Sequence, residues 1–375
     1  MKKTFRSFAS RRSACLAGLL LAWVTTAMAE SIALDERANT NGEIALANLD
    51  GLIEQASDEP GAIDLLLLRG QFLADHDVLD RVAALSEPHD KDAAQLLRRA
   101  SARAAAHRFY DAGLDLDAAQ RAGASPDALL AQRASLQVAS GHAQDTLPEL
   151  RVQAMRRPGF GSHCALALAE AAAGNIEQAD ALYAEALREL DTTSPFPAAA
   201  VWFARGLMWS EQAGNPQRGA AMYLEALRQV PSYVPASLHL AELEAARGDT
   251  AGAVARLERI VAISRDPESL ALLGTLHQSV GNTTLGAREI EQARDRFENL
   301  LQRHPLAFAD HAAEFFLGAG ADPERALYWG RINLLARETR RAYTLAIRAA
   351  QAAQRFDEAR DLEARRDARF DPRAA

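Results

Sequence analysis

One fourteen-residue phrase occurs three times in this chain in related forms. It reads GNIEQADALYAEAL at residues 174–187, GNPQRGAAMYLEAL at 214–227 and GDTAGAVARLERIV at 248–261. In each copy a turn glycine is followed five positions later by a small residue, then by Tyr or Leu, and then by Ala or Ile. Such a repeat constrains the fold strongly, because copies of one unit bury their apolar faces by stacking on one another.

The turn residues of the phrase set its period. The same point is marked by His107, Gly141, Gly174, Gly214, Gly248 and Gly281, at intervals of 34, 33, 40, 34 and 33 residues. Ala and Leu dominate over β-branched residues, and apolar residues recur at helical spacing, so each interval predicts two helices. The sequence therefore predicts an all-α chain of tandem helix pairs.

Periods near 34 residues built from two helices resemble the tetratricopeptide repeat, and the chain resembles a periplasmic protein of that family. The small position that opens the second helix is filled by Ala112, Ala179, Gly219, Ala253 and Gly286. The large apolar position is filled by Leu116, Leu150, Tyr183, Tyr223, Leu257 and Ile290. Small residues let paired helices approach to about 8–10 Å. The resemblance implies a right-handed α-solenoid of about nine helix-turn-helix pairs behind a leading helix.

The repeat also predicts how the chain is divided. We expect one solenoid over residues 43–370, clearest at 93–293 and degenerate at 60–90 and 305–370, with no linker inside it. Residues 43–57 predict an opening helix with Leu46, Leu49, Ile53 and Ala56 on one face. The polar residues 30–42 predict a flexible leader.

Two intervals between turns are long. The first, from Gly174 to Gly214, contains Ser194-Pro195-Phe196-Pro197 and then a helix with several aromatic residues. After Gly281 the second helix is expected to run to about Arg303, and the next turn falls near residues 320–322. A final pair is expected at about 340–353 and 356–369, where a charged last helix would cover the apolar end of a solenoid.

Residues 1–29 have the pattern of an export signal. Five basic residues lie in the first twelve, the apolar stretch ACLAGLLLAWV follows at 14–24, and Ala27-Met28-Ala29 forms a cleavage site. The apolar stretch is shorter than the roughly 20 residues that span a membrane. We expect a periplasmic mature protein without stable membrane insertion, exported by general secretion or, given Ser10-Arg11-Arg12, by the twin-arginine route.

The charge of the mature chain narrows the classes of ligand. Without residues 1–29 the 42 basic residues fall to 37 against 50 acidic ones, a net charge of −13. A surface with this charge repels phosphate backbones, so nucleic acid is not expected as a partner. Cys164 is the one cysteine after residue 29, so the mature chain has no internal disulfide.

Motifs of enzymes are missing from the sequence. It has no Gly-rich phosphate loop followed by Lys, no G-x-S-x-G and no H-E-x-x-H. We therefore predict no catalytic residue, no cofactor and no metal site.

In the resembled family the inner face of the solenoid comes from fixed positions of each first helix. Here that lining is small and weakly acidic, and it includes Leu238, Glu242, Thr275 and Gln278. Such a groove is suited to an apolar contact with a helix or an extended peptide. The alternative, weighed equally, is that neighbouring helices fill the groove. The family's Lys, Arg and Asn clamp for C-terminal carboxylates is absent.

A cluster of aromatic residues is the second candidate binding surface. Phe196, Trp202, Phe203 and Trp209 lie within fourteen residues of a chain that is only 6% aromatic. Trp and Phe concentrate binding energy at interfaces. Trp202 and Trp209 are also seven residues apart on one helical face, which is equally the pattern of a core stripe, and we favour that alternative.

These observations favour a non-enzymatic periplasmic scaffold that binds an envelope or periplasmic protein through its concave face or its aromatic segment. The alternative is a periplasmic carrier of a metal or small ligand on the same solenoid. Its candidate ligands are His163, Cys164, His304 and His311. Asp310, His311 and Glu314 were interpreted more simply as a capping Asp and two solvent-facing side chains at a helix start.

Overall fold

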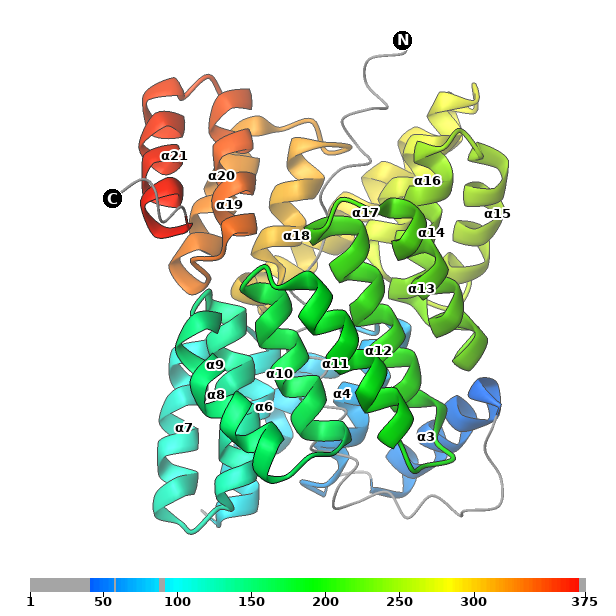
Figure 1. Ribbon diagram of the computed structural model, residues 1–375. Helices are drawn as coiled ribbons and strands as arrows, with labels where there is room; N and C mark the ends of the chain where they lie inside the picture. The colour runs from blue at the N-terminus through cyan, green and yellow to red at the C-terminus, as the bar shows by residue number, and fades with distance from the viewer. Residues whose placement is uncertain (1–40, 57–58, 88–91, 371–375) are drawn as a thin grey trace. The chain divides into compact units, whose positions relative to one another are not determined.

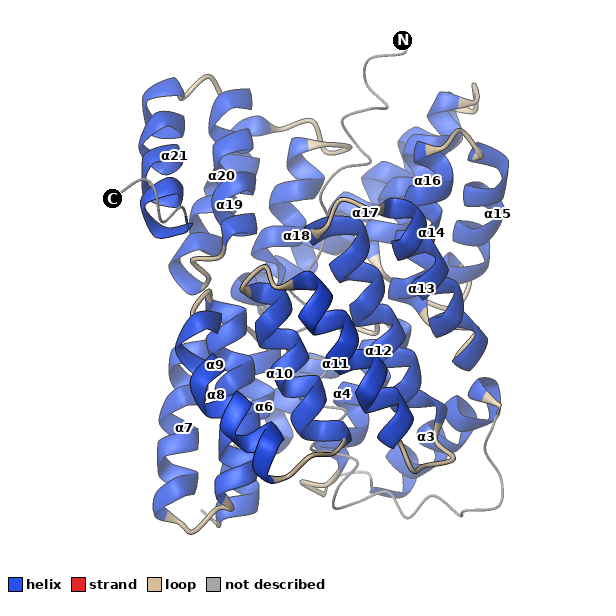
Figure 2. Ribbon diagram, viewed as in Figure 1, coloured by secondary structure: helices blue, strands red, loops and turns tan. Residues whose placement is uncertain are grey.

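The computed structural model describes residues 41–56, 59–87 and 92–370, and within these ranges the chain forms helices and no strand (Figure 2). The predicted signal at 1–29 lies outside the described residues, as does nearly all of the predicted leader at 30–42. The helices are α3 (Gly42–Ala56), α4 (Ala62–Leu73), α5 (Val78–Ser86), α6 (Ala93–Ala105), α7 (Phe109–Arg121), α8 (Pro126–Ser140), α9 (Ala143–Arg156), α10 (Phe160–Ala172), α11 (Ile176–Glu189), α12 (Pro195–Leu207), the π-helical η1 (Met208–Gln212), α13 (Pro216–Gln229), α14 (Val234–Ala246), α15 (Thr250–Val261), α16 (Pro267–Ser279), α17 (Thr283–Arg303), α18 (Pro305–Leu317), α19 (Pro323–Ala336), α20 (Arg340–Ala352) and α21 (Phe356–Phe370).

From α4 onwards the described helices alternate as first and second members of nine successive pairs, with α3 as a leading helix. Within a pair the two helices pack on each other, as α6 does on α7, α10 on α11 and α16 on α17 (Figure 1). The predicted fold class, a tandem helix-turn-helix array of about nine pairs behind one leading helix, is confirmed.

The described residues form two compact units. The N-terminal unit contains residues 41–243 and 262–264, and the C-terminal unit contains residues 244–261 and 265–370. No sequence linker marks this division. In a stacked array each pair contacts mainly its neighbours, so a chain of repeats can divide without a change in composition. Here the division falls inside α14, between Leu243 and Glu244.

The predicted turns are confirmed by the backbone. Gly141, Gly174, Gly214, Gly248 and Gly281 all have a positive φ, between 64° and 96°. His107, which takes the place of glycine, has a φ of 55°, and Ala321 has a φ of 48° at the predicted last turn. A left-handed residue ends a helix and turns the chain back, which is why glycine recurs at this point.

Polar caps fix where several helices begin. The side chains of Ser125, Asn215, Asp266 and Asp322 each accept a hydrogen bond from a backbone N–H in the first turn of the helix that follows. A proline follows each of them at the first helical position, where its missing N–H has no cost. Each of these four helices therefore begins at a polar cap followed by proline.

Small residues bring paired helices into close contact. A Cβ added to Gly286 on α17 would lie 2.3 Å from the carbonyl oxygen of Gly274 on α16. Likewise, a Cβ added to Gly206 on α12 would lie 2.3 Å from the Tyr223 ring on α13. The repeated phrase places small residues where helix backbones meet.

The long intervals have two different causes. The interval before Gly214 is lengthened because α12 continues into η1, so the helical segment runs from Pro195 to Gln212. The interval after Gly281 contains α17, which has 21 residues and ends at Arg303 as expected.

The leading helix begins slightly earlier than predicted. Asn41 accepts a hydrogen bond from the Glu43 N–H, and α3 begins at Gly42, which is buried. Gly42 therefore belongs to the folded array and not to the leader. As expected, Leu46, Leu49 and Ile53 are buried.

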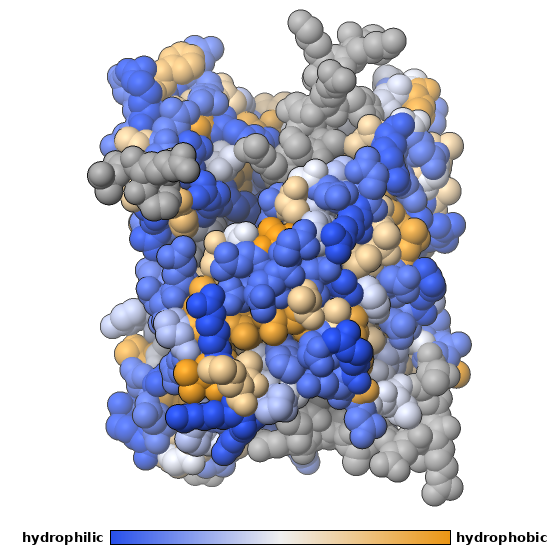
Figure 3. Space-filling model, viewed as in Figure 1, coloured by the Kyte–Doolittle hydropathy of each residue, from blue (hydrophilic) through white to orange (hydrophobic). Residues whose placement is uncertain are grey.

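The face of the protein seen in Figure 3 is mostly hydrophilic. Blue residues dominate the face seen in Figure 3, with smaller hydrophobic areas between them. Across the described ranges, every helix is too short or too polar to cross a membrane.

Candidate functional site

The aromatic segment predicted as a binding surface lies mainly in the core of the N-terminal unit. Phe196, Phe203 and Trp209 are only 1%, 2% and 5% exposed. The Phe196 ring lies 4.8 Å from the ring of Phe72, and the Phe203 ring lies 5.0 Å from that of Tyr233. The favoured interpretation, a core stripe, is confirmed for these three residues because their rings fill the space between helices, and the alternative that they are surface anchors is wrong. Trp202, which is partly exposed, is the exception.

Trp209 belongs to a buried polar cluster around Asp180. The Asp180 carboxylate accepts hydrogen bonds from Trp209 Nε1 at 2.9 Å, Arg205 Nε at 2.8 Å and Arg218 Nη2 at 2.8 Å. Burial alone raises the pKa of Asp180, but these hydrogen bonds and the two arginine charges outweigh it and hold the pKa below its usual value. The Arg218 guanidinium also lies 3.5 Å from the Trp209 ring centre. The cluster joins α11, α12, η1 and α13.

The predicted groove on the first helices of the N-terminal unit is also filled by side chains around α14. The predicted groove residue Leu238 is only 5% exposed. Glu242 is half-buried and lies 3.1 Å from His239 Nδ1, which is also 3.7 Å from Glu211. The His239 ring packs 5.5 Å from that of Tyr223. For this unit the alternative interpretation, that neighbouring helices fill the groove, agrees with the structure.

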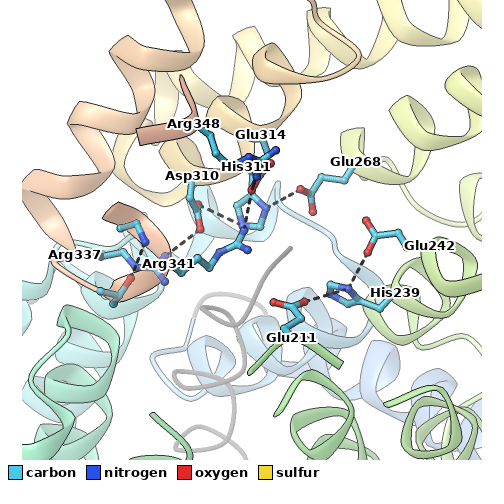
Figure 4. Close-up of polar contacts among 12 residues, drawn as sticks. Glu211, His239, Glu242, Glu268, Asp310, His311, Glu314, Arg337, Arg341 and Arg348 are labelled. Carbon is cyan, nitrogen blue, oxygen red and sulfur yellow. Dashed lines mark hydrogen bonds and ion pairs between the residues drawn. The ribbon is translucent and has the colours of Figure 1, made fainter. Parts of the chain in front are cut away.

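The C-terminal unit carries a different first-helix surface. Charged side chains from α16, α18 and α20 meet there, and we call Glu268, His311, Glu314, Arg341 and Arg348 the charged first-helix face (Figure 4). His311 Nδ1 lies 3.0 Å from Glu268. Arg348 donates from Nη1 to both Glu314 oxygens at 3.4 Å, and Arg341 Nη2 lies 3.9 Å from the same carboxylate. Since α18 contacts both α16 and α20, these pairs link three successive first helices.

A buried ion pair lies beneath this face. Asp310 on α18 is 1% exposed, and its carboxylate accepts a hydrogen bond from Nη1 of Arg337 at 3.2 Å. Arg337 follows the end of α19 and is fully buried. Burial, together with the positive charge of Arg341, lowers the pKa of Arg337 to about 9. The pair orients Asp310, which also lies 3.6 Å from His311 Nε2.

His311 is held in its charged form by its surroundings. Burial favours the neutral imidazole, but the carboxylates of Asp310 and Glu268 outweigh burial and the opposing charge of Arg341, and they raise the pKa of His311 to about 10. At neutral pH the imidazolium therefore donates to Glu268 across the α16–α18 contact.

The titration of His311 predicts a pH-dependent stability. The pKa is about 6.5 in an unfolded chain and about 10 in the fold. The stabilisation is therefore complete below pH 6.5 and is lost as the pH rises toward 10. Each tenfold difference in proton affinity corresponds to about 1.4 kcal/mol. Urea unfolding between pH 6.5 and 10 should show falling stability, and His311→Gln should flatten that slope. Equal slopes for the two proteins would contradict the assignment.

The metal and ligand carrier hypothesis rests on residues that the structure places in ion pairs or in the core. Asp310, His311 and Glu314 do not begin a helix, because α18 starts at Pro305, and all three are buried where capping and solvent exposure were expected. In the described ranges no three His, Cys, Asp or Glu side chains are grouped to hold a metal ion.

The other suspected ligands lie apart from this cluster. His163 Nδ1 lies 2.6 Å from Glu189 of the paired helix. Cys164 is 1% exposed, and burial, with the Glu189 charge, raises the pKa of its thiol. A buried cysteine of this kind packs as a small apolar residue. His304 lies at the junction of α17 and α18.

The remaining predicted groove residues belong to α16. Thr275 is half-buried, and its hydroxyl donates to the carbonyl of Ala271 in the same helix at 2.8 Å. Gln278 is exposed, but its side chain lies against α17, because a Cβ at Gly286 would be 2.7 Å from Gln278 Cγ. Both residues therefore lie at the contact between α16 and α17, and neither is part of the charged first-helix face.

Sequence reasoning named His311 and Glu314 of the charged first-helix face but did not single out Arg341 and Arg348. A signal was present, because these arginines are seven residues apart on the otherwise Ala-rich helix α20. Two arginines at this spacing point to one side of a helix.

Comparison with known proteins agrees with this architecture. A family model described as tetratricopeptide repeat matches residues 211–276. The matched part of the chain, residues 211–276, is therefore similar to the tetratricopeptide repeat. The match spans the turns at Gly214 and Gly248, two of the points that define the repeat.

Two solved structures are also similar to this chain. One is a tetratricopeptide repeat protein from Parabacteroides merdae, with 15% identity, a TM-score of 0.40, and coverage of 69% of this chain and 98% of that one. The other is the APC/C hetero-tetramer Cut9-Hcn1, with 13% identity, a TM-score of 0.48 and coverage of 87% of this chain. This chain spans 64% of the length of that second structure. No curated protein sequence matches significantly.

The succession of helix pairs gives the charged residues a common position. In each pair the second helix carries the small and large positions of the repeated phrase, which pack inside the pair. The first helices α16, α18 and α20 are then neighbours along one face, where their remaining side chains meet.

Proposed function

We propose that this protein is an exported, non-enzymatic scaffold that binds a protein partner on the charged first-helix face of its C-terminal unit. A tetratricopeptide repeat fold implies a scaffold for protein–protein interaction. The proposed location in the periplasm rests on the signal pattern at residues 1–29.

The observation that carries the proposal is the contrast between the two units. In the N-terminal unit buried aromatic rings, such as those of Phe72 and Phe196, pack between first helices, beside the ion pairs of Arg98 with Asp64 and of His239 with Glu211. In the C-terminal unit ion pairs made by Glu268 and Glu314 link three successive first helices. The side chains of Arg348 and Arg341 remain 32% and 15% exposed.

The chemistry of this face favours a polar partner segment. Arg348 reaches Glu314 at 3.4 Å, which is longer than the usual charge-assisted bond of about 2.7–2.9 Å, so its guanidinium can turn to a partner's carboxylate or carbonyl. The ion pair between His311 and Glu268 fixes the positions of both side chains on this face. Positioned charges of this kind give an interface its specificity more than its affinity.

A charge reversal on this face tests the proposal. Arg348→Glu should lower recovery of crosslinked partner from periplasm by at least about tenfold, since it places two carboxylates together where a guanidinium stood. The matched control is Arg360→Glu on α21, whose side chain is 70% exposed and lies on a second helix. Equal recovery with both variants, or repeated failure to recover a specific partner with the native protein, would contradict the proposal.

A further inference from the structure

The leading helix makes a contact that a simple stack of repeats does not provide. The Glu43 carboxylate on α3 accepts hydrogen bonds from the backbone N–H of Ser232 at 3.0 Å and from its hydroxyl at 2.9 Å, across 189 residues of sequence. Next to it, Gly42 lies against the backbone of Gln229 and Val230. Helix α3 also contacts α12 (Figure 1). The start of the N-terminal unit therefore meets the turn between α13 and α14.

A second contact lies behind the first and is apolar. The Phe72 ring at the end of α4 lies 4.8 Å from Phe196 on α12 and 4.3 Å from Tyr233 before α14. All three rings are 1% exposed or less. Helices α3 and α4 are tied to each other by the ion pair of Arg69 with Asp50 at 2.7 Å. The unit is thus joined end to end by an outer polar layer and an inner aromatic layer.

We propose that α3 is a clasp that closes the N-terminal unit, and that this unit opens at the seam between α3–α4 and α12–α14. In a stacked array, consecutive pairs are held along the whole length of their helices. The seam is the place where segments far apart in sequence meet through a short terminal helix, and terminal elements open at low free energy.

Opening of the seam would expose side chains that the closed unit buries. Phe72, Phe196 and Tyr233 would lose their mutual cover, so an apolar first-helix surface would appear that the closed unit hides. This device belongs to the N-terminal unit and does not depend on partner binding at the charged first-helix face.

Two glycines of α3 provide a matched test. In Gly42→Ala the new Cβ would lie 2.3 Å from the Gln229 carbonyl oxygen and would force the seam apart, whereas a Cβ at Gly51 meets nothing within 4 Å. Hydrogen exchange of the mature protein should be on the order of tenfold faster in Gly42→Ala, both in α3 and at residues 229–234, and unchanged in α6 and α7. Gly51→Ala should change none of these segments.

The two ends of the seam must respond together. Faster exchange in α3 alone, with residues 229–234 unchanged, would show that α3 is an appendage and would overturn the proposal. If Gly42→Ala accelerates exchange everywhere, Ser232→Ala replaces it as the test, because it removes only the hydroxyl that donates to Glu43. That variant must then accelerate exchange in both α3 and residues 229–234, and an effect on one side only overturns the clasp.

Discussion

Replacement of Asp180 by Ala is expected to lower the free energy of unfolding by about 3–5 kcal/mol, because it removes the acceptor shared by three buried or half-buried donors. The Arg205 side chain is 10% exposed and would remain charged without its partner. The Trp209 N–H would also lose its hydrogen bond. Arg218, at 41% exposure, is able to turn to water, so the cost arises mainly from Arg205 and Trp209.

Urea unfolding followed by circular dichroism measures this effect at pH 7. The control is Asp117→Ala, which breaks an exposed ion pair with Arg133 whose side chains are 57% and 39% exposed. That substitution should lower the free energy of unfolding by no more than about 1 kcal/mol. Because the pKa of Asp180 is lowered in the fold, its contribution is present above the ordinary carboxyl range and is lost as the pH falls through that range. Similar losses for the two variants at pH 7 would show that the cluster contributes little.

The same substitution, glycine to alanine, is expected to destabilise the folded protein at Gly286 and to stabilise it at Gly113. At Gly286 the Cβ would meet the Gly274 carbonyl at 2.3 Å and Gln278 N at 2.9 Å, so α16 and α17 must separate, at a cost of about 2–3 kcal/mol. At Gly113, inside α7, a Cβ meets nothing within 4 Å. Alanine there should stabilise the protein by about 0.5–1 kcal/mol through helix propensity.

This prediction is tested by measuring the thermal unfolding midpoint of both variants and of the native protein. Gly286→Ala should lower the midpoint and Gly113→Ala should raise it slightly. Stabilisation by both changes would mean that the close approach of α16 and α17 does not depend on glycine.

The repeated phrase predicted the fold because its residues have local physical tasks. A turn residue such as Gly174 needs a positive φ, and a small residue such as Ala179 must sit where two helix backbones meet, so their order alone gives helix, turn and pairing. His107 followed the same rule despite its side chain, with a φ of 55°. Phe72, by contrast, meets Tyr233 across 161 positions, and no repeat spacing predicts that closure.

The candidate site was predicted less well for a related reason. For Phe196 and Phe203 the core interpretation was favoured over that of surface anchors, although a helical stripe of aromatics has the same spacing in both cases. The contacts that bury them, Phe196 with Phe72 and Phe203 with Tyr233, join residues far apart in sequence. His311 and Glu314 were recognised as neighbours one turn apart, but their partners Glu268 and Arg348 lie 43 and 34 residues away, on helices whose packing a single sequence does not give.

The central claim is that the charged first-helix face of the C-terminal unit is the partner-binding surface. Its most direct test is a photo-crosslinking amino acid placed at Arg348 and, separately, at Leu335 on second helix α19, where the native side chain is 82% exposed. Both proteins are exported and irradiated in cells. The account predicts a discrete crosslink to another protein from position 348 and none from position 335. A crosslink from position 335 alone, or none from position 348, would contradict it.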